Sequence, residues 1–219
     1  MDASDPALFA ARATAYSVLA LALQYPEGEV EDLLFGGWAE KALSGCLPEL
    51  EELGYDSVEE LERLLAALNA DVKTSDLRKE YTRLFISAHP KLPCPPYESV
   101  YVSKEREVMS DEVSEILAIL RGWGLGVSDD FKDLPEHVAV ELELAAYLLE
   151  QMKLGIQEGD PEEAEKAERD LRRLVGHLRR WVPAFSECVR RESRVEFYRE
   201  AVTALSAYVR DEAAILGLQ

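Results

Sequence analysis

Cysteine and histidine are scarce in this chain, which has three of each among its 219 residues. The cysteines, Cys46, Cys94 and Cys188, are odd in number, and no two of them have the CxxC spacing of zinc and redox sites. No histidine lies at metal-ligand spacing from another histidine or from a cysteine. We therefore expect no disulfide framework, no metal site and no bound cofactor.

Motifs that bind phosphate groups or carry a catalytic serine are also missing. The chain has no GxxxxGK[ST], GxGxxG or GxSxG sequence, and we expect that it is not an enzyme. A long apolar run is absent too. The stretch 8–23 is interrupted by Arg12, Thr14 and Ser17, is too short to cross a bilayer, and follows no basic segment. The sequence thus predicts a cytoplasmic protein without stable membrane insertion.

Basic residues are outnumbered, with 24 Lys and Arg against 43 Asp and Glu, which gives a net charge of −19. A surface of this sign repels the phosphates of nucleic acids, so nucleic acid is not expected as a partner. Residues 169–219 hold ten arginines and seven acids, so the acidic excess belongs to residues 1–168. A basic polypeptide is the partner that this charge favours.

Helical periodicity dominates the chain, and no segment has the alternation of a strand. In the C-terminal half, apolar residues recur every three or four positions, as on the buried face of a helix. One such stripe consists of Val138, Leu142, Ala145, Leu149 and Met152. We predict an all-α protein, a compact multi-helix bundle of roughly eight to ten helices. Residues 1–219 are expected to form a single domain with a possible hinge at residues 123–133.

Several helix starts are predicted from capping boxes, in which a Ser or Asp accepts from a free backbone N–H and a Glu three residues later reaches back. These boxes begin at Ser57, Asp133 and Asp160. The second box places His137 in the first turn of a helix. Glu136 and Glu141 would favour the charged imidazolium there, and the helix N-terminus would oppose it. The alternative interpretation of His137 is a helix cap or a surface residue without a functional role. Pro183 is expected to end or kink the helix that contains it.

Four of the ten prolines fall within seven positions, residues 90–96. The surrounding segment, residues 81–101, reads YTRLFISAHPKLPCPPYESVY. The prolines exclude a helix and favour an extended path. A stiff loop beside aromatic residues loses little entropy on binding, which suits recognition of a peptide. The alternative interpretation is a rigid connector whose aromatic residues belong to the core.

These segments together resemble the TorD/DmsD/NarJ family of redox-enzyme maturation chaperones. Members pair an aromatic-x-x-Leu-Phe helix end with a proline-rich loop, and the counterparts here are residues 81–85 (YTRLF) and 92–101 (LPCPPYESVY). Their second motif, Glu-Pro-x-Asp-His at a helix start, is similar to residues 133–137 (DLPEH).

The resemblance implies a TorD-like fold and a cytosolic chaperone, monomer or homodimer. Its partner would be the twin-arginine signal peptide, or the N-terminal segment, of the catalytic subunit of a molybdopterin oxidoreductase. The chaperone would hold that subunit for cofactor insertion before export or assembly. By the same resemblance, the peptide-binding residues are Tyr81, Leu84, Phe85, Pro96, Tyr97 and Tyr101 on the apolar part of a groove, and Glu136 and His137 at its polar edge.

Two other functions stay open at this point. One is a structural helical subunit of a larger redox-enzyme assembly, which would need a constant partner for any large exposed apolar patch. The other is a nucleotide-dependent enzyme, because weak guanine-nucleotide binding has been suggested for the family. The missing phosphate loop and the negative charge oppose the second.

Overall fold

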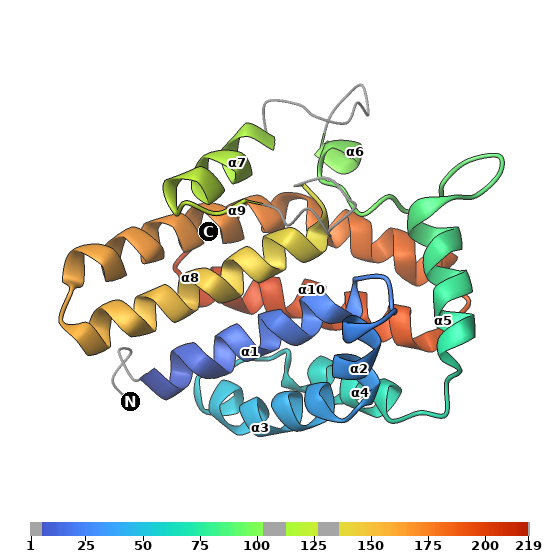
Figure 1. Cartoon of the computed structure of the whole chain (residues 1–219), viewed down its shortest axis with the longest axis horizontal. Helices are drawn as coiled ribbons and strands as arrows, with labels where there is room; N and C mark the ends of the chain where they lie inside the picture. The colour runs from blue at the N-terminus through green and yellow to red at the C-terminus, as the bar shows by residue number, and fades with distance from the viewer. Residues whose placement is uncertain (1–5, 103–112, 127–135, 219) are drawn as a thin grey trace.

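The computed structural model describes residues 6–102, 113–126 and 136–218 (Figure 1). Within these ranges the chain forms ten α-helices, one π-helical turn and no β-strand, which confirms the predicted all-α fold and number of helices. The elements are α1 (Pro6–Ala22), α2 (Glu29–Phe35), α3 (Trp38–Glu52), α4 (Val58–Leu68), α5 (Thr74–Tyr81), η1 (Thr82–Ile86), α6 (Ser99–Val102), α7 (Val113–Gly122), α8 (Val138–Glu158), α9 (Pro161–Glu192) and α10 (Glu196–Ile215).

Four long helices, α1, α8, α9 and α10, form the body of the molecule (Figure 1). Helix α8 packs between α1 and α9, and α9 packs against α10. Because α8 has neighbours on two sides, Leu144 and Leu148 are buried as well as the predicted stripe from Val138 to Met152. The periodicity therefore gave the buried face correctly. None of the helices in the described ranges is long and apolar enough to cross a membrane.

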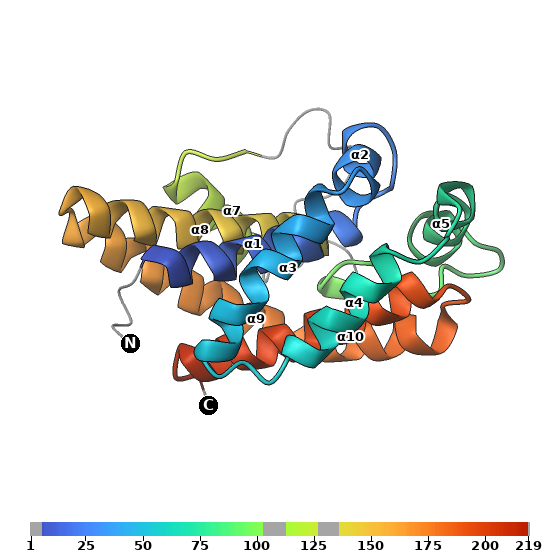
Figure 2. The same cartoon turned by 90° about the horizontal axis from the view of Figure 1, so that it is seen from below.

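Shorter helices cover this body on its other sides. Helix α3 packs on α1, and α4 packs on α10, while α7 lies on the opposite side of the bundle in Figure 1. Figure 2 shows α5 at the end of the bundle where α9 turns into α10. That end is fixed by Glu80, whose carboxylate accepts from the Arg194 backbone N–H at 2.6 Å. The proline-rich segment that follows α5 therefore begins beside the end of α9.

A buried ion pair joins the first and last helices. Arg12 donates from Nε and Nη2 to the two carboxylate oxygens of Glu212, at 2.8 and 2.9 Å. The Tyr55 hydroxyl donates to the same carboxylate, and the Tyr208 hydroxyl donates to the Arg12 carbonyl at 2.9 Å. Glu212 is fully buried. The charge is tolerated in the core because several donors surround it.

The predicted helix starts at Ser57 and Asp160 are confirmed, but only one of these two side chains makes its capping bond. Asp160 caps α9 as expected, accepting from the Glu163 N–H at 3.1 Å. Ser57 precedes α4, but its side chain makes no capping bond. Its backbone N–H donates to Asp211 Oδ2 at 2.7 Å, in place of the predicted contact with Glu60. Asp133 lies outside the described residues, as does most of the predicted hinge. Helix α9 continues through Pro183 to Glu192, so that proline does not end the helix.

Candidate functional site

The proline-rich segment leaves η1 and returns to the body of the protein at Cys94. Its outer part, from Ile86 to Lys91, is mostly exposed and contains a cis peptide bond before Pro90. Cys94 is buried, and its N–H donates to the Leu84 carbonyl at 3.2 Å. Residues 87–98 contain no helix, as the prolines predicted.

The segment is attached to the beginning of α8 by backbone pairing. The Val138 N–H donates to the Pro96 carbonyl at 2.9 Å, and Tyr97 forms an isolated antiparallel bridge with His137. The rings of Tyr97 and His137 meet edge to face, with their centroids 5.8 Å apart. Two motifs about forty residues apart in the sequence are thereby brought together.

His137 is the N-cap of α8, which agrees with the alternative interpretation as a cap, and it lies just before the first turn, not within it. Its Nδ1 accepts from the Ala139 N–H at 3.1 Å. In the neutral ring the proton therefore sits on Nε2, which lies 3.3 Å from the Tyr81 hydroxyl. That hydroxyl donates in turn to the Leu23 carbonyl at 3.1 Å. The chain of contacts links α8, α5 and the end of α1.

The apolar residues assigned by resemblance divide into a buried set and a partly exposed set. Tyr81, Leu84 and Phe85 are 4%, 0% and 3% exposed, and Pro96 is also buried. Phe85 packs against Tyr81, Phe185 and Tyr198. Among the apolar residues assigned to the groove, only Tyr97 and Tyr101 are partly exposed. The others lie beneath the surface and shape it from below.

Tyr101 rests on the face of α9 that points toward this segment. Its ring stacks on Trp181, with centroids 5.9 Å apart and planes at 24°, and meets Phe185 edge to face. Trp181, Phe185 and Cys188 follow one another at helical spacing, so one face of α9 forms the floor below the proline-rich segment.

A buried group of charged residues lies next to this floor, and the sequence patterns did not identify it. His177 Nε2 lies 3.1 Å from Glu98 Oε2 and 3.3 Å from Glu141 Oε1. Arg180 approaches His177 Nδ1 at 3.0 Å and Glu98 at 3.6 Å. The Trp181 indole N–H points to the other oxygen of Glu141. The sequence did contain one sign of this group, because Glu141 and His177 lie on the inward faces of the α8 and α9 stripes. Glu141 pairs with His177 and not with His137.

Burial and pairing act in opposite directions on these groups. Burial raises the pKa of Glu141 above its ordinary value, and the hydrogen bond from His177 only partly offsets this. Burial lowers the pKa of His177, but the hydrogen bond and charge of Glu141, together with the charge of Glu98, outweigh it. The pKa of His177 therefore stands above its ordinary value of 6.5. Glu136 is 1% exposed, and its charge further opposes ionisation of Glu141.

Replacing His177 by glutamine is expected to change the pH dependence of stability. Because the pKa of His177 is higher in the folded protein than in the unfolded chain, protonation of His177 stabilises the fold. This contribution is complete below pH 6.5 and is lost as pH rises through the folded-state pKa. The difference in melting temperature between wild type and His177→Gln should thus shrink as pH rises above 6.5. Melting curves from pH 6 to pH 8.5 measure this, with His89→Gln on the exposed loop as the control. A difference in melting temperature between wild type and His177→Gln that stays constant from pH 6 to pH 8.5 would contradict the raised pKa of His177.

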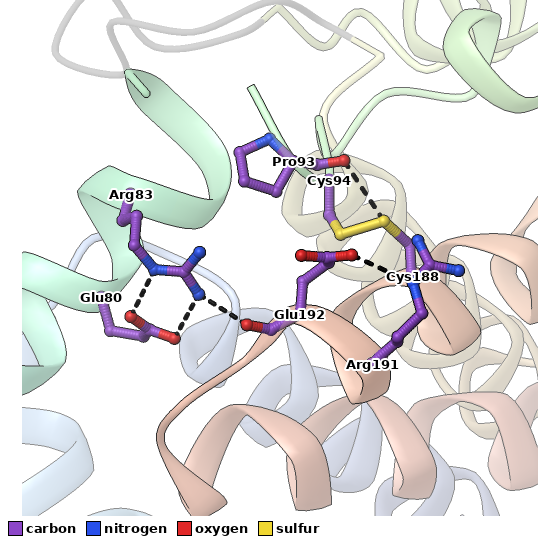
Figure 3. Close-up of a disulfide and its surroundings, with 7 residues drawn as sticks. All are labelled: Glu80, Arg83, Pro93, Cys94, Cys188, Arg191 and Glu192. Atoms are coloured by element: carbon purple, nitrogen blue, oxygen red, sulfur yellow. Dashed lines mark hydrogen bonds and ion pairs between the residues drawn. A yellow bond between two sulfur atoms is a disulfide. The ribbon is translucent and has the colours of Figure 1, made fainter. Parts of the chain in front are cut away.

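A disulfide joins Cys94 of the proline-rich segment to Cys188 of α9 (Figure 3), so the expectation of no disulfide is wrong. The two Cα atoms are 5.8 Å apart, although 94 residues separate them in the sequence. Spacing between cysteines carries no information on such a distant pair, whereas the fold places them in contact. Cys46 is a buried free cysteine.

Figure 3 also shows the polar contacts that hold the end of α9 near this bond. Arg83 makes two hydrogen bonds to Glu80, at 2.7 and 2.8 Å, and donates to the Glu192 carbonyl at 2.7 Å. Burial raises the pKa of Glu80, but the hydrogen bonds from Arg83 and from the Arg194 backbone outweigh this and lower it overall. Glu80 and Arg83 thus fasten η1 to the helix that carries Cys188.

Two features lie apart from this site. Within the described residues, no group of three or more His, Cys, Asp or Glu is arranged to hold a metal ion. An apolar groove of about 550 Å³ lies at the other end of α8, where Phe9, Met152, Ile156 and Ile215 line it. It contains none of the eight residues assigned by resemblance.

Comparison with known proteins gives matches over most of the chain. The family model described as nitrate reductase delta subunit matches residues 51–187. A chaperone protein TorD from Photobacterium profundum is 27% identical over 174 residues, which covers 78% of this chain and 77% of that protein. A selenate reductase assembly chaperone protein from Thauera selenatis is 29% identical over 124 residues, covering 55% of this chain and 62% of that protein.

One solved structure has the same fold. It is the crystal structure of a redox enzyme maturation protein from Archaeoglobus fulgidus, with a TM-score of 0.54 and 24% sequence identity. The match covers 90% of this chain and 93% of the other. Both segments that form the site, residues 81–101 and 136–141, fall inside the range that the family model matches.

Proposed function

The chain belongs to the nitrate reductase delta subunit family of TorD-like chaperones, and we propose that it binds the twin-arginine signal peptide, or the N-terminal segment, of a molybdopterin oxidoreductase catalytic subunit. It holds that subunit in the cytoplasm for cofactor insertion before export or assembly. The relatives support a role in redox-enzyme maturation, and their names point to a non-enzymatic function.

The observation that carries this proposal is the pairing of Tyr97 with His137. It joins the proline-rich segment to the start of α8 and so places the two motifs of the resemblance in one site. The peptide meets the partly exposed rings of Tyr97 and Tyr101, beside Val102, the exposed neighbour of Tyr101 in α6. Beneath that surface, the site is shaped by Tyr81, Leu84, Phe85 and Pro96.

The chemistry of the peptide matches the two parts of this site. Its apolar stretch packs on the tyrosines, and burial of that stretch supplies most of the affinity. The strongly acidic chain attracts the peptide's arginines to the polar edge just before α8, where Glu136 and His137 themselves are buried, each with 1% exposure. Arg–carboxylate pairing contributes orientation and association rate more than affinity.

Peptide binding measured by fluorescence anisotropy tests the proposal. A labelled peptide with two adjacent arginines followed by an apolar stretch is expected to bind saturably. Changing both arginines to alanine, or Tyr97 to alanine, should each weaken binding about tenfold, the equivalent of about 1.4 kcal/mol. Ile156→Ser, in the distant groove, should leave the affinity unchanged. Equal affinity for both peptides, or a loss confined to Ile156→Ser, would overturn the site assignment.

The same protein can identify its client. A tagged chain is expected to recover the catalytic subunit of a molybdopterin oxidoreductase from its native cell extract, and recovery should fall with the Tyr97→Ala variant. Recovery of an unrelated partner in constant proportion, by both variants equally, would favour the alternative of a structural helical subunit. Exposed apolar side chains away from the site, such as Trp38 and Leu154, are the surface that such a partner would cover.

A further inference from the structure

The disulfide connects the proposed peptide site to the helix beneath it. Cys94 lies two residues before Pro96, whose carbonyl pairs with α8. Cys188 lies on the same face of α9 as Trp181 and Phe185, the residues that support Tyr101. The bond therefore fixes the proline-rich segment against its floor at the position where the Cys94 N–H donates to the Leu84 carbonyl.

The other ties of this part of the segment are weaker than a covalent bond. They include the Cys94 N–H bond to Leu84 and the Pro96 carbonyl bond to Val138, and the residues from Ile86 to Lys91 beyond them are mostly exposed. Side-chain contacts hold the later part of the segment, where Tyr97 meets His137, Tyr101 stacks on Trp181 and Glu98 lies beside His177. Breaking the disulfide removes the covalent tie at Cys94, so the part it frees is the stretch before Pro96.

We propose that Cys94–Cys188 is a thiol–disulfide exchange site, and that its reduction by a cellular dithiol releases the proline-rich segment and increases affinity for the client peptide. In reducing compartments, disulfides are mostly transient and redox-sensing, and the proposed cytoplasmic function places this one in such a compartment. The effect on affinity rests on the proposed function, whereas the exchange reaction itself does not.

The two cysteines differ in exposure, from which we infer the order of the reaction. Cys94 is fully buried and Cys188 is partly exposed. A thiolate of the dithiol attacks Cys188 Sγ, the protein disulfide breaks, and Cys94 leaves as a thiolate that takes up a proton. The second thiol of the reductant then attacks the reductant's own sulfur in the mixed disulfide and releases Cys188, which is protonated in turn. The protein disulfide gains two electrons and two protons, and the dithiol is oxidised to its disulfide.

Reduction exposes residues that the oxidised form covers. Leu84 and Phe85 are assigned to the peptide site by resemblance, yet both are buried while the segment is clamped. Once Cys94 is free, the segment can move away from Leu84 and allow an apolar peptide to reach it. In the closed position the reduced Cys188 thiol still has an acceptor, because its sulfur lies 3.3 Å from the Pro93 carbonyl.

The experiment compares the oxidised and reduced forms of the full chain. Alkylation after denaturation should label one cysteine, Cys46, in the oxidised form and three after dithiothreitol treatment. Reduction is expected to tighten binding of the twin-arginine peptide at least fivefold and to speed amide hydrogen exchange in residues 86–98. Cys188→Ser breaks the bond from its exposed side, so this variant should bind like the reduced form and ignore dithiothreitol. Cys46→Ser should respond as the wild type does.

Each result bears on the inference. Unchanged affinity and unchanged exchange on reduction would overturn it, as would tighter binding in the oxidised form. If alkylation after denaturation still labels only Cys46 in a chain first held natively in millimolar dithiothreitol, the bond is a permanent crosslink and the inference is overturned. If neither form binds the peptide, the proposed function fails. Faster exchange in residues 86–98 would in that case still support release of the segment on reduction.

Discussion

Replacing Arg12 by methionine is expected to lower the free energy of unfolding by about 3–5 kcal/mol, because it leaves a carboxylate buried without its cation. Glu212 is fully buried, and Arg12 satisfies both of its oxygens at 2.8 and 2.9 Å. In the variant, the Tyr55 hydroxyl is the donor left beside this charge. Urea unfolding, followed by circular dichroism, measures the change.

The matched control is Arg63→Met on the surface of α4. Arg63 pairs with three acids, Glu59 at 2.6 Å, Glu60 at 3.0 Å and Glu200 at 3.5 Å, but its side chain is 42% exposed. Such pairs contribute about 0–1 kcal/mol. The double variant Arg12→Met/Glu212→Met removes both buried charges and should recover much of the loss. Equal urea midpoints for Arg12→Met and Arg63→Met would show that the buried pair carries no special stability.

The long helices were predictable because their buried faces repeat with the period of a helix. The stripe from Val138 to Met152 is buried on α8 as expected. Helices α2 and α3 were missed for an equally local reason. Each follows a glycine, Gly28 and Gly37, that gives no side-chain cap, and Pro48 inside α3 reads as a helix breaker. Regularity of pattern, more than helix length alone, decided what could be inferred.

Tertiary contacts explain where the capping motifs gave the wrong result. Ser57 has the sequence of a cap, but Asp211 of α10 takes its backbone N–H. His137 lacks the residue type usually expected at a cap, yet its Nδ1 performs that role. In both cases a residue far away in the sequence, Asp211 for one and Tyr97 for the other, decides the local geometry.

The candidate site was only partly accessible to sequence reasoning. Its two motifs could be recognised as segments, and the fold joins them through Tyr97 and His137. The buried contact of His177 with Glu141 and the disulfide from Cys94 depend on partners 36 and 94 residues away. No local pattern encodes such distances, because they result from how α6, α8 and α9 pack.

Replacing Phe85 by alanine distinguishes a supporting role in the core from direct contact with the peptide. Phe85 is 3% exposed and its ring centroid lies 4.8 Å from that of Tyr81, 5.8 Å from Tyr198 and 6.0 Å from Phe185. Removing a ring from such surroundings costs about 3–5 kcal/mol, and we expect a loss of this size in urea unfolding. Phe85→Leu keeps most of the volume and should cost about 1.5 kcal/mol or less.

Peptide affinity completes this test, with Tyr97→Ala as the comparison. Tyr97 is partly exposed, so Tyr97→Ala should lower the free energy of unfolding by about 1 kcal/mol or less. The same change should weaken binding of the peptide. If Phe85 acts from beneath the surface, Phe85→Leu should bind the peptide as the wild type does under oxidising conditions. A stable Phe85→Leu protein that no longer binds the peptide would mean that the peptide contacts the Phe85 ring directly. In that case this part of the site rearranges even with the disulfide in place, because the oxidised structure buries Phe85 against Tyr81, Phe185 and Tyr198.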